Sequence, residues 1–366
     1  MGRCLLWNRY ESNRFAKGVE REIDIVVTIG DVAKAAGVSR STASYALTGK
    51  RTISEPVKQR VLEAVADLGY TPNAGARALA TSQTMVIGLL ARFLEDEFAP
   101  AMLQYVLGVT QGARELGYDT LLVSEEDGVH ALARLSSSRM VDGFVLLNVA
   151  EHDDRLPVLR AAPQPGSLVG LPADSAGIDV FDLDFVASGR LMVDSLYDLG
   201  HRELMLVSQS EDVVARGGAY VWRLADAAQA RARELGLTLH HYYGSSSQPG
   251  IGTDLNAYLD AHPAVTGLLV NNEAAAAALP SVLTERGLRS PDDLSVVGRY
   301  SNDFARAFSL PFSAIDAAAD ELGRRAVRQL VARIQRGPDE SAPNVVDLIA
   351  PTIHDRGSTA PPKSRP

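Results

Sequence analysis

The spacing of apolar residues divides the chain into two regions that meet near residue 81. Between residues 28 and 70, apolar residues recur every three or four positions, which predicts short amphipathic helices. From residue 85 onward, apolar runs of strand length such as 85–91 alternate with longer amphipathic segments such as 100–116. This alternation predicts parallel β-sheets covered by helices on both faces. An interruption at 174–184 indicates that the second region consists of two α/β halves.

The first region predicts three helices joined by short turns. Gly37 ends the first helix, because glycine adopts the left-handed conformation without a steric penalty. Ser39 is placed to N-cap a second helix that runs from Arg40 to about residue 47. A third helix follows, with Ser54 as its cap and Gly69 at its end. Two short helices joined by a glycine-containing turn form a helix-turn-helix motif.

The second of these helices carries candidate side chains for reading DNA. In helix-turn-helix proteins the N-terminal turn of the second helix enters the major groove. Here that turn contains Arg40, Ser41 and Thr42, with Tyr45 one turn further on. An arginine at this place can donate two hydrogen bonds to guanine, and a serine can bond to either kind of base edge. The alternative is a three-helix scaffold without a role in nucleic-acid binding.

Three consecutive segments of this region resemble the headpiece of the lactose/galactose repressor (LacI/GalR) family. They read TIGDVAKAAGVS, STASYALTGKR and SEPVKQRVLEAVADLGYTPNAGARALAT. The resemblance implies base contacts by Arg40, Ser41, Tyr45 and Arg51, and contacts to the DNA backbone by Thr28, Ser39, Thr42 and Asn73. Ala43 and Tyr45 depart from the V-S-R or V-S-H pattern that is more usual in the family. The operator sequence therefore does not follow from the resemblance.

The end of the third segment resembles the hinge helix of this family, which folds on operator DNA. The matching stretch is 72–82, and it includes Ala76, Arg77 and Leu79. The resemblance implies that Leu79 enters the minor groove. Apolar wedges of this kind part a base step and kink the duplex.

The resemblance continues over the second region and covers residues 28–362. It rests on segments such as RMVDGFVLLN, HPAVTGLLVNNEAAAAAL and PTIHDRGSTAPP. The implied fold is an α/β body of two Rossmann-like, periplasmic-binding-protein-like subdomains after an all-α headpiece and hinge helix. The expected domains are a headpiece at 27–71, the hinge, an effector-binding and dimerisation domain at 83–357, and a tail at 358–366. The expected subdomains are about 84–181 with 318–340, and 182–316 with 344–357.

A cleft between the two subdomains is the expected ligand site, because ligands bind at the carboxyl ends of parallel strands. The family binds small molecules there, commonly sugars or nucleobases. The positions that match its ligand contacts are Arg92, Phe93, Arg223, Asn272, Glu273 and Tyr300. Tyr300 stands where the family has a sugar-binding aspartate, and this loss argues against a plain hexose. A ligand that presents a negative group to Arg92, Arg223 or Arg299 is a weaker hypothesis.

Charge is distributed unevenly along the chain. The net charge is −9 at pH 7, yet residues 27–81 contain seven Lys or Arg against four Asp or Glu. A basic head on an acidic body places the attraction for phosphate at one end of the protein.

Other chemistry is sparse. The single cysteine, Cys4, excludes an intramolecular disulfide framework. His240 and His241 are adjacent, so they point to opposite faces of a strand, and no metal site is predicted. The sequence contains no P-loop, G-x-G-x-x-G or G-x-S-x-G motif, so neither an enzyme nor a cofactor is predicted.

Residues 1–26 do not fit the headpiece and lack the features of a signal peptide. They are interpreted either as a disordered basic arm or as an over-long assignment of the start site. No apolar run approaches the roughly 18 residues of a membrane helix, so we expect a cytoplasmic protein.

Together these features predict a ligand-responsive transcriptional regulator, most simply a repressor. We expect a homodimer on a pseudo-palindromic operator, because two-fold protein symmetry mirrors the symmetry of the half-sites. The polar, proline-rich tail favours a dimer over a tetramer. The alternative is a cytosolic small-ligand sensor whose headpiece does not bind DNA.

Overall fold

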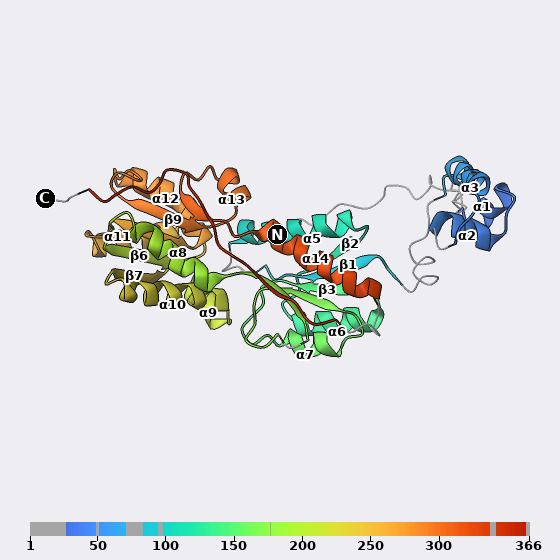
Figure 1. Cartoon of the computed structure of the whole chain (residues 1–366), viewed down its shortest axis with the longest axis horizontal. Helices are drawn as coiled ribbons and strands as arrows, with labels where there is room; N and C mark the ends of the chain where they lie inside the picture. Colours follow the sequence, from blue (N-terminus) through green and yellow to red (C-terminus); the bar gives the residue numbers. More distant parts are fainter. Residues whose placement is uncertain are drawn as a thin grey trace, which may run out of the picture. The chain divides into compact units, whose positions relative to one another are not determined.

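The computed structural model describes residues 27–48, 51–70, 83–93, 98–175, 177–336 and 342–363. Contacts divide the chain into two compact units, Met1–Ala80 and Thr81–Pro366 (Figure 1). The first unit is the headpiece and the second is the body. Within the described residues, no helix combines the length and the apolar character needed to cross a membrane.

The described residues of the headpiece form a bundle of three short helices. Their bounds are Ile29–Ala35 (α1), Arg40–Thr48 (α2) and Glu55–Leu68 (α3). Small side chains form the core, which allows the helices to approach closely; the fully buried members include Val32, Ala43 and Val61. The turn residues Gly37 and Gly69 have φ values of 67° and 61°, in the left-handed region that glycine adopts freely. The predicted helix-turn-helix is therefore confirmed.

Side-chain caps fix the starts of the first two helices. The amide of Thr28 donates to Oδ2 of Asp31 over 2.9 Å, and the Thr28 hydroxyl forms the other half of a capping box. These hydrogen bonds hold the pKa of Asp31 below its usual value. At α2, Oγ of Ser39 accepts from the amide of Thr42 over 3.0 Å, as predicted for an N-cap.

The described strands of the body form two six-stranded sheets, one in each lobe. The first sheet has the order β11-β5-β4-β3-β1-β2 and is parallel throughout. Its strands are Val86–Leu90 (β1), Asp119–Val123 (β2), Gly143–Leu146 (β3), Gly166–Val169 (β4), Asp179–Leu183 (β5) and Val346–Ile349 (β11). The central strands are buried on both faces, which explains their continuous apolar runs.

The second sheet has the order β12-β10-β9-β8-β6-β7, and β12 is antiparallel to β10. Its strands are Glu203–Ser208 (β6), Thr238–Tyr243 (β7), Gly267–Asn271 (β8), Ser295–Arg299 (β9), Ser313–Ile315 (β10) and Ile353–His354 (β12). The remaining neighbours in this sheet are parallel.

Helices cover both faces of each sheet, as the alternating pattern predicted. The first sheet packs against α5 (Ala99–Glu115) and α14 (Ala319–Arg336) on one face, and against α6 (Gly128–Ser138) and α7 (Arg155–Ala161) on the other. The second packs against α11 (Gly250–Ala261), α12 (Glu273–Glu285) and α13 (Asn302–Ala307) on one face, and α8 (Phe185–Tyr197) and α10 (Ala219–Glu234) on the other. The short helix α9 spans Glu211–Ala215.

Close helix contacts depend on glycine at particular positions. A Cβ atom at Gly189 in α8 would lie 2.2 Å from the carbonyl oxygen of Leu224 in α10. A Cβ atom at Gly323 in α14 would lie 2.6 Å from the amide nitrogen of Val109 in α5. Each helix pair therefore packs backbone against backbone at these points.

The chain crosses between the lobes after β5, after β10 and again between β11 and β12 (Figure 1). The predicted boundary between the subdomains, at 181/182, falls inside β5. The predicted placement of 344–357 in the second lobe is wrong for β11, which lies in the first sheet. Val346 of β11 pairs with Val180 of β5 in the first sheet. Asp179 strengthens this edge, because it accepts from the amide of Val345 and from Arg333 of α14. Apolar periodicity identifies a strand but not its neighbour.

Candidate nucleic-acid interface and ligand cavity

The outward face of α2 carries the side chains predicted to read DNA bases. Arg40 and Ser41 are exposed and Tyr45 is half-buried, whereas Ala43 and Ala46 face the core. Residues three or four positions apart share a helix face. Ala43 and Ala46 therefore lie together on the core side of α2, and Arg40 and Ser41 lie on the outward side. Arg51, beyond the end of α2, is exposed. The geometry leaves the predicted base-contacting side chains accessible.

The side chains predicted to contact the DNA backbone lie at the starts of α1 and α2. The hydroxyl of Thr28 donates to Asp31, and the hydroxyls of Ser39 and Thr42 are 2.8 Å apart. Amide groups at the start of a helix bind phosphate through their free N–H donors and the helix dipole. Asn73, Ala76, Arg77 and Leu79, the predicted backbone contact and hinge residues, lie outside the described residues.

A cavity of about 260 Å³ lies between the two lobes of the body. Side chains from both sheets line it just beyond the carboxyl ends of parallel strands. Arg92 follows β1 and Asn148 follows β3 in the first lobe. Gln209 follows β6, Glu273 follows β8 and Arg299 ends β9 in the second lobe. Ligand sites form at this edge because the strands end there and their loops diverge.

An ion pair joins Glu273 and Arg299, two of the charged residues that the second lobe contributes to the cavity. Nη2 of Arg299 lies 2.6 Å from Oε1 of Glu273, and these side chains are 3% and 8% exposed. Nε of Arg299 also donates to Oδ1 of Asn271 over 2.6 Å, and Gln209 donates to the other oxygen of Glu273. The guanidinium lies over the ring of Phe185, 5.6 Å from its centroid. Arg299 is therefore neutralised and held in place by the protein itself.

A buried carboxyl group, Asp182, faces the cavity from β5. Its two oxygens accept from the amides of Leu171 and Leu183, each over 2.9 Å. Burial raises the pKa of Asp182 to about 6, despite these hydrogen bonds to the charged form. An ionised Asp182 can accept hydrogen bonds from ligand hydroxyl groups.

Aromatic side chains complete the wall of the cavity. They are Phe98, Tyr105, Phe185 and Tyr220. Phe185 and Tyr220 pack together with 5.4 Å between ring centroids, and burial raises the pKa of Tyr105. Aromatic faces beside a few fixed polar groups are typical of small-molecule sites.

The structure brings together only some of the predicted effector-binding residues. Arg92 and Glu273 line the cavity, but Phe93, Arg223, Asn272 and Tyr300 are not among its lining residues. Nε of Arg92 is buried without a hydrogen-bond partner among the described residues.

Three of the residues outside the wall bind neighbouring protein groups instead. Nη1 of Arg223 donates to the carbonyl of Leu171 over 2.6 Å. Asn272 caps α12, and its Nδ2 lies within 3.3 Å of three carbonyl oxygens. The Tyr300 hydroxyl donates to the carbonyl of Phe312 inside the core of the second lobe.

Sequence reasoning missed Asp182, Tyr105, Phe185 and Gln209. Gln209 had a usable signal, since it lies two residues after the four-residue apolar run 204–207, and ligand groups gather at the carboxyl ends of strands. Tyr105 offered none, because an aromatic residue within a helix is indistinguishable in sequence from a core residue.

Two family models match the chain. Residues 28–73 match the model for bacterial regulatory proteins of the lacI family, and residues 193–359 match the periplasmic binding protein-like domain. The regulator CelR of Thermobifida fusca is 29% identical over 316 residues, which cover 84% of this chain and 92% of CelR.

Two solved structures of transcriptional regulators have a similar fold. The CelR–cellobiose complex superimposes with a TM-score of 0.62 at 24% identity, over 91% of this chain and 99% of that one. The lac repressor dimer bound to operator and the anti-inducer ONPF gives a TM-score of 0.72 at 23% identity, with the same coverage. These structures support the fold of headpiece and two-lobed body, as predicted.

The two family models, matched at 28–73 and 193–359, agree with the helix-turn-helix and the two α/β lobes. The predicted fold class is confirmed, and the matched family consists of regulators rather than enzymes. The chain belongs to the lacI family of bacterial regulatory proteins and is a DNA-binding transcriptional regulator.

Proposed function

We propose that this regulator is a repressor that binds a pseudo-palindromic operator as a homodimer under the control of a small molecule. The observation that carries the proposal is the outward face of α2, where Arg40 and Ser41 are exposed over a core of small side chains. The lac repressor structure of similar fold is a dimer bound to operator. Such a protein acts in the cytoplasm, where its DNA is.

In this proposal the headpiece reads bases in the major groove. Arg40, Ser41, Tyr45 and Arg51 contact bases, and Thr28, Ser39, Thr42 and Asn73 contact the backbone. Arginine provides two parallel donors for guanine, so Arg40 supplies most of the discrimination. Ala76, Arg77 and Leu79 form the minor-groove hinge.

The cavity between the lobes is the proposed effector site, and its charges favour a neutral, sugar-like ligand. Glu273 already neutralises Arg299, and Arg223 is not part of the wall. Arg92 and Arg216 also line the cavity, but Asp154 and Asp182 line it with them. Together these features weaken the hypothesis of an acidic ligand that binds several arginines. Asp182 supplies a carboxylate acceptor for hydroxyl groups, although the sequence places Tyr300 where the family has its aspartate. CelR binds cellobiose in its solved complex, which is consistent with a carbohydrate.

Control by ligand follows from the connections between the lobes. A ligand that contacts Arg92 on one side and Glu273 on the other favours one relative position of the lobes. If that position alters the separation of the two headpieces in the dimer, the ligand changes operator affinity. By linkage, operator then changes ligand affinity by the same factor.

The test measures binding of the full-length protein to DNA from upstream of its own gene over a salt series. We expect log affinity to fall steeply and linearly with log salt, because bound phosphates release counterions. Binding of two chains per DNA site is expected in analytical ultracentrifugation. Carbohydrate binding without any DNA preference would instead support the ligand-sensor alternative.

Neutral mono- and disaccharides and their acid forms are then compared by thermal shift and by their effect on DNA binding. Stabilisation by a neutral carbohydrate that also changes operator affinity is expected. Stabilisation by acidic sugars alone contradicts the proposed ligand class.

A further inference from the structure

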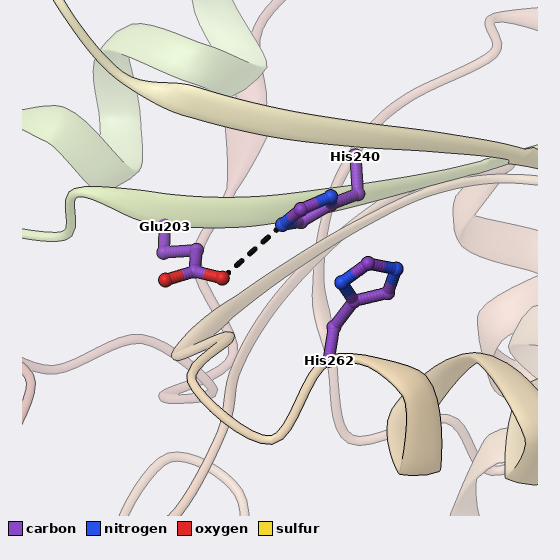
Figure 2. A group of neighbouring side chains, drawn as sticks. All are labelled: Glu203, His240 and His262. Carbon is purple, nitrogen blue, oxygen red and sulfur yellow. Dashed lines mark hydrogen bonds and ion pairs between the residues drawn. The ribbon is translucent and has the colours of Figure 1, made fainter.

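A cluster of potential metal ligands lies in the second lobe, at the end of the sheet opposite to the ligand cavity. Glu203 is the first residue of β6, His240 lies on β7, and His262 directly follows α11 (Figure 2). One potential ligand atom from each side chain lies within 4.8 Å of the others. The cavity lies at the carboxyl ends of these strands, so the two sites are separate.

The strand register explains why Glu203 and His240 meet although 37 residues separate them. Met205 pairs with His240, and Glu203 is two residues before Met205, so all three share one face of the sheet. His241 points to the opposite face, where its Nε2 lies 2.9 Å from Oγ of Ser208. The sequence excluded a metal site because His240 and His241 diverge, but the partners of His240 come from other elements.

Contacts with neighbouring side chains hold the members of the cluster beside one another. Nε2 of His240 lies 3.1 Å from Oε1 of Glu203. The rings of His240 and His262 stack with 3.7 Å between centroids, and the hydroxyl of Tyr242 hydrogen-bonds to Nε2 of His262. That bond leaves Nδ1 of His262 as the ligand atom, and Figure 2 shows a nitrogen of this ring on the edge that faces the other two side chains.

We propose that Glu203, His240 and His262 bind a divalent transition-metal ion. Two imidazole nitrogens and one carboxylate oxygen suit Zn²⁺, Co²⁺, Ni²⁺ or Cu²⁺, whereas Mg²⁺ and Ca²⁺ prefer oxygen alone. Tetrahedral ligands at Zn²⁺ distances are about 3.4 Å apart, so the two stacked rings rotate until both ligand nitrogens face the ion. The side chains of His240 and Glu203 are 24% and 34% exposed, which gives an ion access and leaves a position for water.

Tyr242 is a positioning residue in this proposal. Its hydroxyl fixes the tautomer and orientation of His262 through the nitrogen that does not bind metal, and such partners change metal affinity by about 10- to 100-fold. Tyr242 shares the sheet face with His240 and stacks on Tyr258 of α11, with 4.1 Å between ring centroids. A bound ion would tie β6, β7 and the end of α11 together.

The test is zinc titration of untagged full-length protein by calorimetry, in a Cys4→Ser background so that the thiol does not compete. We expect one Zn²⁺ per chain. His240→Gln, His262→Gln and Glu203→Gln should each weaken binding at least tenfold, and Tyr242→Phe should weaken it by about 10- to 100-fold. His241→Gln is the matched control on the same strand, and it should bind Zn²⁺ as the parent does.

Thermal unfolding with and without Zn²⁺ provides a second readout. The parent should melt at a higher temperature with Zn²⁺, and Glu203→Gln, a surface change that preserves size, should lose most of that increase. Absence of a stoichiometric zinc site in the parent overturns the proposal, as does unchanged binding in both His240→Gln and His262→Gln. In that case the three residues form only an ion pair and a ring stack. Neither measurement uses DNA or effector. A negative result would therefore contradict the metal site and leave the proposed regulatory function unaffected.

Discussion

Arg299 and Glu273 form an ion pair in the wall of the ligand cavity, with 2.6 Å between Nη2 and Oε1. Both residues lie at the carboxyl ends of neighbouring strands, β9 and β8, and both are buried. The pair therefore stabilises the fold of the second lobe and also forms part of the cavity wall. Removing one partner leaves a buried charge without compensation.

We expect Arg299→Met to lower the free energy of unfolding by about 3–5 kcal/mol, as measured by urea denaturation. The double variant Arg299→Met with Glu273→Gln should lose less than the sum of the single changes, because no unpaired charge remains. Strictly additive losses would contradict this account. The exposed pair of Arg306 and Asp303 is the control, and Asp303→Asn should cost no more than about 1 kcal/mol.

Operator recognition should depend on Arg40 in a base-specific manner. Because Arg40 is exposed at the first position of α2, Arg40→Ala should relax discrimination by about 1–3 kcal/mol at one base pair. The measurement is fluorescence anisotropy on operator duplexes with each base pair replaced in turn. Arg60→Ala, an exposed arginine on α3, should not change which base pair is preferred. Equal weakening on every duplex would assign Arg40 to phosphate contact only.

The raised pKa of Asp182 should make stability depend on pH. Burial raises this pKa to about 6 from an ordinary value of 3.8. Between these values the folded protein retains a proton that the unfolded chain releases. The contribution of protonated Asp182 to the free energy of unfolding is therefore fully present below pH 3.8, and it is lost as the pH rises through 6. The loss should be on the order of 2–3 kcal/mol.

Urea unfolding of the parent and Asp182→Asn from pH 4 to pH 7.5 measures this contribution. Relative to the variant, the parent should lose stability as the pH rises, because asparagine does not titrate. Parallel stability curves would show that Asp182 has an ordinary pKa in the folded protein. Comparing slopes rather than absolute values separates titration from the hydrogen bond that asparagine cannot make to both Leu171 and Leu183.

The contact between α8 and α10 should not tolerate a methyl group. A Cβ atom at Gly189 would lie 2.2 Å from the Leu224 carbonyl oxygen, so Gly189→Ala must separate the helices and should cost roughly 1–3 kcal/mol or more. Gly252 in α11 is the matched control, since a Cβ atom there meets only Oε1 of Gln248 at 3.5 Å. Gly252→Ala should stabilise the protein by about 0.5–1 kcal/mol, as measured by thermal and urea unfolding. A neutral Gly189→Ala would refute the close contact.

The sequence alone determined the elements and their class. Apolar residues on one face of each headpiece helix, the Ser39 cap and the left-handed Gly37 are local features, and they specified the helix-turn-helix. Alternating strands and helices specified the parallel strands of both sheets for the same reason, but not the antiparallel pairing of β12 with β10. These signals are readable because periodicity and capping depend on residues close in the chain.

The tertiary structure decided which residues meet. It placed β11 beside β5, turned Tyr300 into the core, and put Asp182, Tyr105 and Gln209 into the cavity. It also brought His262 and Glu203 to His240 across three elements. Strand order and side-chain direction at loop ends depend on contacts between distant segments, and the pattern within one segment carries no information about its partner.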